Sequence, residues 1–292
     1  MDESVRKACA TYAAHLALGH EVEDRPEARF VRFRPAPQVY DANFVQRVRA
    51  ATPEATERVL AATEEWLAGF EHRQVLTDPE TPAVFQAHLA LEGYKPRPTL
   101  QMLLEGDLQG PAPAGVEIRG VAAPEDWTSV QALKRVRDVE DCEKAGRAPW
   151  GEEVTAQMVL AVQAKAPQVR FFLARHEGKD CAYFSSFPGV GGVGMLEDLF
   201  TLPEARGRGV ARALIHHCAA DARRRGAGRL LIGADPADTP RHAYAAMGFQ
   251  PLCLTWAWLK TGAIEPRGHS IGRAERRRGA GPATRAQVLS RG

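Results

Sequence analysis

A run of glycines and arginines, Arg206 to Arg212 (RGRGVAR), is the segment of this sequence best suited to chemistry. It follows an apolar run that is expected to be a strand, and it opens a helix that is expected from Gly209 to about Arg225. Backbone N–H groups at a helix start have no carbonyl partner within the helix and lie at the positive end of its dipole. Because glycine lets a ligand approach such amides closely, the segment predicts a cradle for a pyrophosphate. The side chains of Arg206, Arg208 and Arg212 can add charge-assisted hydrogen bonds to phosphate.

Other phosphate-binding loops fit this segment less well. A nucleoside-triphosphatase loop requires Gly-Lys-Ser/Thr, which the sequence lacks here. A dinucleotide fingerprint requires a third glycine and a later acidic residue, and the third glycine is missing. A Gly-x-Gly pair before a helix is weak support for any ligand when it stands alone.

A second motif makes the pattern more specific. The segment 116–260 resembles the GCN5-related N-acetyltransferase (GNAT) superfamily through two motifs in the right order. The Arg/Gln-x-x-Gly-x-Gly/Ala motif is matched by Arg206, Gly209 and Ala211, and the aromatic-x-x-x-Gly-Phe motif by Tyr244, Gly248 and Phe249. The resemblance implies an α/β (α+β) fold of GNAT type, with a mixed sheet flanked by helices and splayed into a V between its fourth and fifth strands.

The resemblance also implies the cosubstrate and the residues that hold it. Acetyl-CoA is expected to enter the V, with its pantetheine arm paired to the backbone of Leu199, Phe200 and Thr201. The pyrophosphate is expected on the amides of Gly207, Arg208, Gly209, Val210, Ala211 and Arg212, next to the side chain of Arg206. No metal is expected.

Acylation of an amine by direct attack needs a base for the amine and an acid for the leaving thiolate. Tyr244 occupies the position of the tyrosine that acts as the acid in many members of the superfamily, although a tyrosine there can also serve the core alone. The run LEDLFTLPEARGRG is similar to polyamine acetyltransferases, in which the Glu of Leu-Glu-Asp is the base. Glu197 is therefore the candidate base, with a substrate-binding or a structural role as alternatives, and Asp198 is assigned to substrate binding.

Strand geometry constrains this pair of acids. Successive side chains of a strand point to opposite faces, so only one of Glu197 and Asp198 faces a given pocket unless a bulge intervenes. The asparagine that many members use to contact coenzyme A is Ala237 here, and the fifth strand (LLIGAD) ends without an acid at the position of the base in some relatives. These departures leave other cofactor contacts open and increase the weight on Glu197.

The elements that must position these residues divide the chain into four segments. We expect an N-terminal α/β domain at 1–107, a linker at 108–115 (LQGPAPAG), the GNAT domain at 116–260 and a disordered basic tail at 261–292. Expected strands of the GNAT domain are 116–121, 169–175, 180–187, 193–202, 229–232 and 249–259, and its expected helices are 125–139, 152–165, 209–225 and 239–246. In the N-terminal domain we expect helices at 53–68 and 80–91 and strands at 72–77 and 99–104.

The two domains share a faint repeat. HLALEGYKP (88–96) aligns with AYAAMGFQP (243–251), which places Gly93 on Gly248 and Leu89 on Tyr244. The repeat indicates either chance similarity or a duplicated domain whose first copy is degenerate and has lost the glycine loop and the tyrosine. The polar–aromatic run 39–45 (VYDANFV) is interpreted as a solvated turn, with a wall of the acceptor pocket as the alternative. The acceptor pocket itself is expected around 125–150 and 188–192.

Composition narrows the class of protein further. The chain has 292 residues, a net charge of +2 and 45% hydrophobic residues, as in an ordinary globular protein. The residues after Lys260 include seven arginines against two glutamates, so the excess of basic residues lies in this tail. The rest of the chain is net negative, and a specific nucleic-acid surface is therefore not expected there. Five scattered cysteines and the absence of a long apolar run predict a cytoplasmic protein with reduced thiols and no membrane span.

The sequence leaves the acceptor open. A small-molecule amine is the first hypothesis, a protein N-terminus or lysine the second, and a non-catalytic acyl-CoA sensor the third. A homodimer is compatible with the sequence.

Overall fold

Helices and strands alternate through both halves of the chain, and the computed structural model describes residues 2–262. The N-terminal half consists of α1 (Glu3–Ala17), β1 (Glu21–Arg25), β2 (Ala28–Arg32), the 3-10 helix η1 (Tyr40–Ala42), β3 (Phe44–Gln46), α2 (Pro53–Trp66), β4 (His72–Thr77), α3 (Ala83–Leu91) and β5 (Lys95–Leu104). The C-terminal half consists of β6 (Glu117–Gly120), α4 (Pro124–Lys144), α5 (Glu152–Gln163), β7 (Arg170–His176), β8 (Lys179–Val190), β9 (Val193–Thr201), the 3-10 helix η2 (Pro203–Ala205), α6 (Val210–Arg224), β10 (Arg229–Ala234), α7 (Pro240–Ala246) and β11 (Gln250–Thr261).

The elements expected after residue 116 are all present, with ends shifted by a few residues. In the N-terminal half, α3 begins later than expected because Asp78 and Thr81 form a turn closed by the Asp78 N–H to Thr81 Oγ1 hydrogen bond (3.1 Å). The sequence did not predict α1 or β1–β3. The expected tail lies outside the described residues from residue 263 onward.

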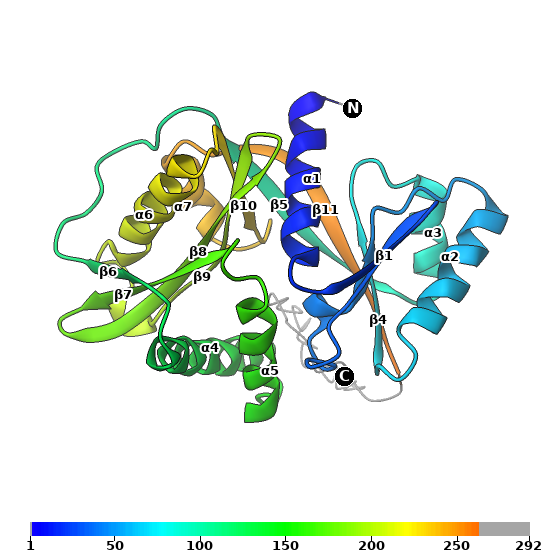
Figure 1. The fold of residues 1–292 in the computed structure, drawn as a ribbon, viewed down its shortest axis with the longest axis horizontal. Helices are drawn as coiled ribbons and strands as arrows, with labels where there is room; N and C mark the ends of the chain where they lie inside the picture. The colour runs from blue at the N-terminus through cyan, green and yellow to red at the C-terminus, as the bar shows by residue number, and fades with distance from the viewer. Residues whose placement is uncertain (1, 263–292) are drawn as a thin grey trace, which may run out of the picture.

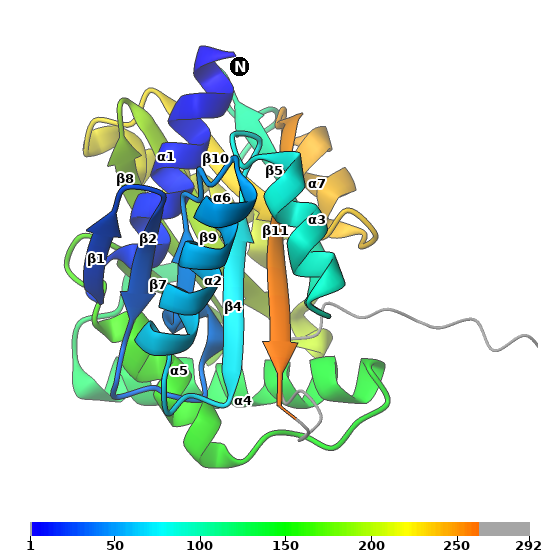
Figure 2. The same ribbon diagram turned by 90° about the vertical axis from the view of Figure 1, so that its right-hand side faces the viewer.

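The eleven strands of residues 2–262 form one sheet, in the order β1-β2-β3-β4-β11-β5-β10-β9-β8-β7-β6. The last strand, β11, runs antiparallel between β4 and β5 of the N-terminal half. In return, β5 pairs with β10, from Leu104 opposite Leu230 to Leu100 opposite Ala234. Figure 1 shows β5 and β11 crossing between the two halves, and Figure 2 shows β11 beside β4. Each half therefore depends on a strand supplied by the other.

The order of elements recurs along the chain. α1-β1-β2-β3-α2-β4-α3-β5 in the N-terminal half is repeated as α5-β7-β8-β9-α6-β10-α7-β11, while β6 and α4 have no counterpart. The repeat expected from the sequence falls at the same junction in both copies, because Gly93 and Gly248 both have positive φ (83° and 100°) at the end of α3 and α7. In each copy the next residue closes the helix in the same way, with Tyr94 N–H bonded to Leu89 O and Phe249 N–H to Tyr244 O.

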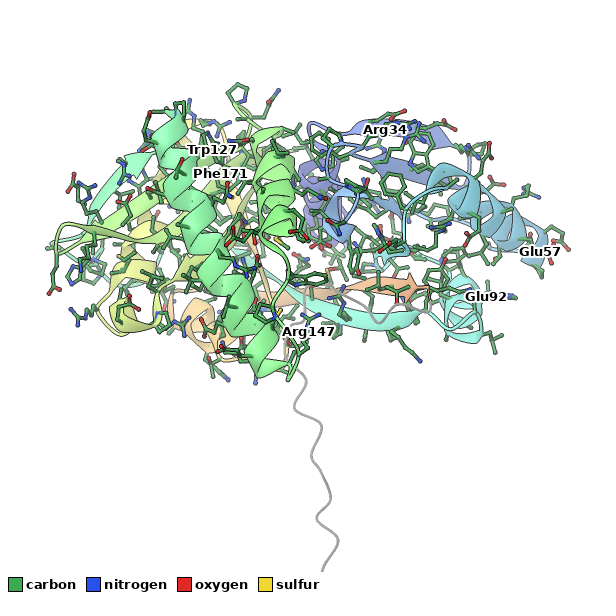
Figure 3. All side chains as sticks on the ribbon, turned by 90° about the horizontal axis from the view of Figure 1, so that it is seen from below. Arg34, Glu57, Glu92, Trp127, Arg147 and Phe171 are labelled. Carbon is green, nitrogen blue, oxygen red and sulfur yellow. The ribbon has the colours of Figure 1, made fainter. Side chains whose placement is uncertain are left out.

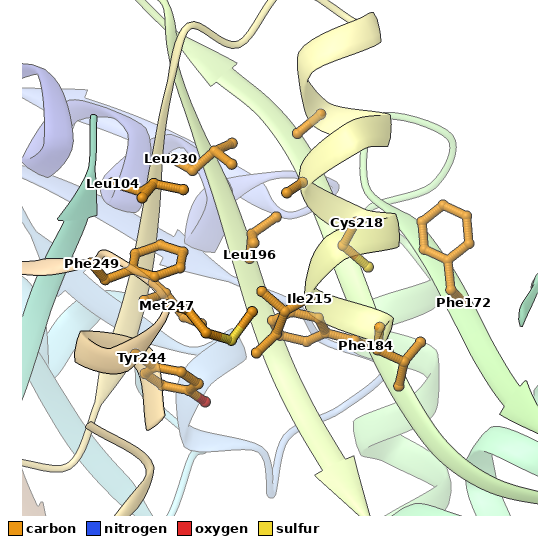
Figure 4. Close-up of a cluster of buried hydrophobic side chains, with 14 of the residues drawn as sticks. Leu104, Phe172, Phe184, Leu196, Ile215, Cys218, Leu230, Tyr244, Met247 and Phe249 are labelled. Atoms are coloured by element: carbon orange, nitrogen blue, oxygen red, sulfur yellow. The ribbon is translucent and has the colours of Figure 1, made fainter. Parts of the chain in front are cut away.

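The centre of the sheet is buried on both faces, and side chains alternate between them. On one face Leu196, Leu230 and Ile232 pack against α6 and α7, in the cluster shown in Figure 4. On the other face their neighbours Met195 and Leu231 pack against α1. Packing on both faces fixes the positions of the strands, so the core also fixes the positions of residues at the strand ends.

Phe249 directly precedes the exchanged strand β11 and is 0% exposed within the same cluster. We expect Phe249→Ala to lower the free energy of unfolding by about 3–5 kcal/mol through lost burial and the cavity left behind. The matched control is Leu254→Ala on the same strand, where the side chain is 39% exposed, and its cost is expected to stay below about 1 kcal/mol. Urea unfolding of both variants measures the difference, and equal losses would contradict the assigned packing of β11.

Candidate active site

β9 and β10 pair for only part of their length. Their parallel register runs from Val193 opposite Arg229 to Leu196 opposite Ile232 and then stops. Leu199, Phe200 and Thr201 therefore lie on β9 beyond its last pair with β10. This is the splayed V that was expected between the fourth and fifth strands, and it leaves that edge of β9 open to an extended ligand.

The glycine loop follows directly from this open edge. Gly207 and Gly209 have positive φ (75° and 81°), and Gly209 is the N-cap of α6 without a side-chain hydrogen bond. Within the described part of the chain, no acceptor is bonded to the backbone N–H groups of residues 207–212. These amides are therefore available to an anion, and the pyrophosphate expected on them stays a prediction.

The N-terminal half closes the equivalent helix start by itself. Thr52 caps α2 and its hydroxyl accepts a hydrogen bond from the Ala55 N–H (3.3 Å), while Pro53 has no N–H to offer. At the end of α3, Leu89 stands where Tyr244 stands in the second copy and is fully buried. The first copy thus lacks both the free amides and the hydroxyl.

Two of the three arginines of the loop are bound to protein groups. The Arg206 guanidinium donates to both carboxylate oxygens of Glu140 and to Thr201 O (3.0 Å), and it holds the pKa of Glu140 at about 2. Arg212 donates to the backbone carbonyls of Gln109 and Pro111. The segment expected to be a linker therefore runs past the start of α6. Arg208 is exposed and pairs only with the exposed Glu177 (3.2 Å), so it is the most available of the three to a phosphate.

A bulge in β9 decides the arrangement of the two acids. Asp198 has φ of 68°, and the pairing with β8 shifts where Tyr183 faces Phe200 but Ser185 faces Glu197. Because the bulge breaks strict alternation, both Glu197 and Asp198 line the same cavity. The sequence alone had left the two faces of the strand and the bulge as alternatives, and the structure has the bulge.

Asp198 forms ion pairs with two cations on α4. Its two carboxylate oxygens accept hydrogen bonds from Lys134 Nζ and the Arg137 guanidinium, and the Lys134 side chain is only 8% exposed. Burial by itself raises the pKa of Asp198, but the two cations outweigh it and hold the pKa below its usual value. Asp198 is therefore an anchored anion at neutral pH.

Glu197 has the opposite character. Burial and the negative charge of Asp198 raise the pKa of Glu197 to about 7, against the opposing effect of Lys165 and Arg137. A carboxyl group with a pKa near the working pH can both take and release a proton. The geometry therefore separates the two acids into one poised for proton transfer and one held charged.

The cavity beside these acids has a volume of about 150 Å³ and is bounded by both halves of the chain. Seen from below in Figure 3, α5 stands between α4 and the N-terminal half, and Trp127 of α4 packs on Phe171 of β7 with ring centroids 5.4 Å apart. The lining residues are His15, Leu16, His20, Val39, Asp41, Lys134, Arg137, Met158, Ala161, Val162, Lys165, Phe171, Ser185, Glu197 and Asp198.

The interpretation of residues 39–45 as a solvated turn is wrong. Every residue of this run except Asp41 is buried, and Asn43 fixes its shape by donating to Ala36 O (2.8 Å) and Val39 O (2.9 Å). Val39 and Asp41 line the cavity, as the alternative interpretation expected. Residues 188–192, which the sequence had suggested for the acceptor pocket, do not line it, because α1 covers this turn through Thr11 and the carbonyl of Val190.

Tyr244 lies at one end of the hydrophobic cluster in Figure 4 and is 7% exposed. Its ring packs against Phe249, and its hydroxyl makes no hydrogen bond to another described residue. Burial, with a smaller contribution from the negative charge of Glu197, raises the pKa of Tyr244. Tyr244 is outside the lining of the cavity, whereas Glu197 is part of it.

The range 125–150 expected for the acceptor pocket contains Lys134 and Arg137 of α4, but the sequence named neither residue. It missed His15 of α1 and also His20 and Lys165, which lie just after α1 and α5, because no motif joins these positions. One signal was present in α4, where Lys134 and Arg137 follow the apolar Val130 and Leu133 on one helical face.

Two features are absent from residues 2–262. There, no three His, Cys, Asp or Glu side chains are placed together to hold a metal ion. In the same range, no helix combines the length and apolarity that crossing a membrane requires.

Residues 134–249 match the sequence model of the acetyltransferase (GNAT) family. A streptothricin acetyltransferase from Streptomyces lavendulae is 44% identical over 55 residues, which are 18% of this chain and 29% of that protein. This chain therefore matches less than a third of that relative's length.

Two solved structures are similar in fold over most of the chain. A GCN5-related N-acetyltransferase from Kribbella flavida has a TM-score of 0.61 at 17% identity, covering 90% of this chain and 97% of that one. A tandem GNAT protein from the clavulanic acid biosynthesis pathway has a TM-score of 0.53 at 16% identity, covering 80% of this chain and 78% of that one. At these identities the likeness shows the fold alone.

Removing one of the two cations that hold Asp198 tests the anchored pair. Lys134→Met is expected to cost about 3 kcal/mol of unfolding free energy, because it leaves a buried carboxylate with a single partner. The control on the same helix is Lys144→Met, which breaks an i,i+4 pair whose lysine is 57% exposed, and it is expected to cost about 0.5 kcal/mol at most. Urea denaturation at pH 7 compares the two, and a Lys134 variant as stable as the control would refute the anchoring.

Proposed function

We propose that the GNAT domain formed by the C-terminal half of this chain transfers an acetyl group from acetyl-CoA to a primary amine of a small molecule by direct attack. The observation that carries the proposal is the position of Glu197. Its buried carboxyl lies on β9 directly after the last pair with β10, so a proton-accepting group stands at the mouth of the V and in the wall of the cavity.

The residues present fit acetyl-CoA. The amides of Gly207 to Arg212 lack acceptors in the described chain and suit the pyrophosphate, with Arg208 as the available side chain. The open edge of β9 at Leu199, Phe200 and Thr201 suits the pantetheine amides. Acetyl-CoA, when bound, supplies the activated acyl group.

The chain's own residues handle the protons. Glu197 accepts a proton from the acceptor ammonium, because its pKa near 7 leaves a large fraction of the carboxyl ionised at neutral pH. Asp198 is fixed in the wall of the cavity by Lys134 and Arg137, and its carboxylate oxygens can accept a hydrogen bond from the amine. The Tyr244 hydroxyl keeps its proton at neutral pH and is the donor for the leaving thiolate.

The shape of the cavity favours a small acceptor. α1 and residues 39–41 of the N-terminal half bound it on one side, and α4 and α5 bound it on the other. A peptide acceptor, the alternative from sequence, needs an open groove at this place. The acetyltransferase that this chain matches over a short stretch is named for streptothricin.

Cosubstrate binding is tested at the helix start. Gly209→Asp is expected to weaken acetyl-CoA binding at least about tenfold, because the new carboxylate caps the free amides and repels phosphate. The control is Gly226→Asp at the other end of α6, where φ is also positive (102°) and an added Cβ meets nothing within 4 Å. Calorimetric titration of acetyl-CoA into both variants and the wild type decides the outcome. A wild type that does not bind acetyl-CoA would overturn the proposal.

The base is tested by pH dependence. Because only ionised Glu197 can accept a proton, kcat/KM is expected to rise about tenfold per pH unit below pH 7 and to level off above it. Glu197→Gln is expected to lose this inflection together with about 10²–10⁴-fold in rate. The exposed Glu204→Gln serves as control and should keep both. Thiol release measured from pH 5.5 to 9 provides the profile, and an unchanged inflection in Glu197→Gln would exclude Glu197 as the base.

A further inference from the structure

One ammonium group in the cavity has no partner among residues 2–262. Lys165 follows α5, lines the cavity and is 6% exposed, yet its Nζ has neither a hydrogen bond nor an ion pair with any residue in 2–262. A buried charge is normally paired, because leaving water without a partner costs several kcal/mol. The other two cations of the cavity, Lys134 and Arg137, are already bound to Asp198.

Two histidines extend this side of the cavity. Nδ1 of His15 and both ring nitrogens of His20 are buried without a hydrogen-bond partner among the described residues. Burial, and next the charge of Lys165, lower the pKa of both rings, to about 4 for His20, so they are neutral at pH 7. Each neutral ring has one N–H to donate and one nitrogen that accepts.

The fold brings these three side chains together by placing the ends of α1 and α5 against each other. A Cβ at Gly19, just after α1, would stand 2.1 Å from the carbonyl oxygen of Ala164, so only glycine allows this approach. His20 follows Gly19 and Lys165 follows Ala164. We name Lys165, His15 and His20 the α1–α5 cluster.

The charges of the cavity point to the kind of group that is missing. Glu197, Asp41 and Asp198 all act on Lys165 electrostatically, but none of them lies within ion-pair distance of its Nζ in the described chain. A ligand that carries its own single negative charge can pair with Lys165 and accept N–H groups from the histidines. A dianion such as phosphate is less suited, because the same cavity already contains three acidic side chains.

We propose that the acceptor is an amino acid, whose carboxylate binds the α1–α5 cluster while its amine is presented to Glu197. This inference rests on the proposed acetyltransferase function and makes Lys165 a specificity-determining residue. It assigns the N-terminal half a role in the site, since α1 contributes His15 and the turn after it contributes His20.

The test compares each common amino acid with the amine that differs from it only by loss of the carboxylate. Examples of such pairs are lysine with cadaverine and ornithine with putrescine. Full-length protein is titrated calorimetrically with each pair, and thiol release from acetyl-CoA is followed in parallel. At least one amino acid is expected to bind, and to react with a kcat/KM, at least about tenfold better than its decarboxylated partner. Equal or better use of the decarboxylated amines, or no binding of any amino acid by a protein that binds acetyl-CoA, would overturn the inference.

Variants of Lys165 show whether this residue is responsible. Lys165→Met is expected to lose the preference for the amino acid while keeping its affinity for acetyl-CoA, which also reports that the variant is folded. Lys165→Arg, which keeps the charge, is expected to retain most of the preference, and Lys179→Met at an exposed position is expected to change neither. If Lys165→Met still prefers the amino acid over its decarboxylated amine, the inference is overturned, because Lys165 then only compensates the charge of the cavity acids. A wild-type protein that does not bind acetyl-CoA would instead refute the proposed function.

Discussion

The exchange of β5 and β11 between the two halves is the constraint on which the rest of this structure depends. β11 lies between β4 and β5, and β5 lies between β11 and β10, so neither half completes its part of the sheet without the other. A continuous sheet fixes the distance and angle between the halves. It therefore also fixes the cavity, whose walls come from α1 and residues 39–41 on one side and from α4, α5 and β9 on the other.

Within that frame, a single bulge in β9 gives two neighbouring acids different tasks. The positive φ of Asp198 turns its carboxylate to Lys134 and Arg137, which keep it charged. Glu197 stays in the cavity without a comparable partner, and the fixed charge of Asp198 contributes to raising its pKa to about 7. The anchored acid thereby tunes the free one, which is a common way to obtain a base that works near neutral pH.

The two copies of the repeated order of elements have diverged in their chemistry while keeping their architecture. Gly209 leaves the amides at the start of α6 free, whereas Thr52 and Pro53 close the start of α2. The first copy has kept α1, and with it His15 and His20, in the wall of the cavity formed with the second copy. A copy without free amides at its helix start can thus still form a wall of the cavity, because burial against the second copy keeps it folded and in place.

The sequence by itself determined the local features of this protein: the GNAT pattern of the C-terminal half, nearly all of its helices and strands, the glycine loop, the junction at Gly93 and Gly248, and the acid pair on β9. These follow from periodicity and from the backbone needs of a few residues, which are visible within short windows of sequence. It did not predict α1 or β1–β3, and it misassigned residues 39–45 to solvent. Only the tertiary structure decided that β5 and β11 are exchanged, that the strand bulges at Asp198, and that Lys165, His15 and His20 meet. The physical reason is that strand partners and buried charges are selected by contacts between segments far apart in the sequence, such as Lys134 and Asp198 at a separation of 64 residues, and such contacts leave no periodic trace in the sequence.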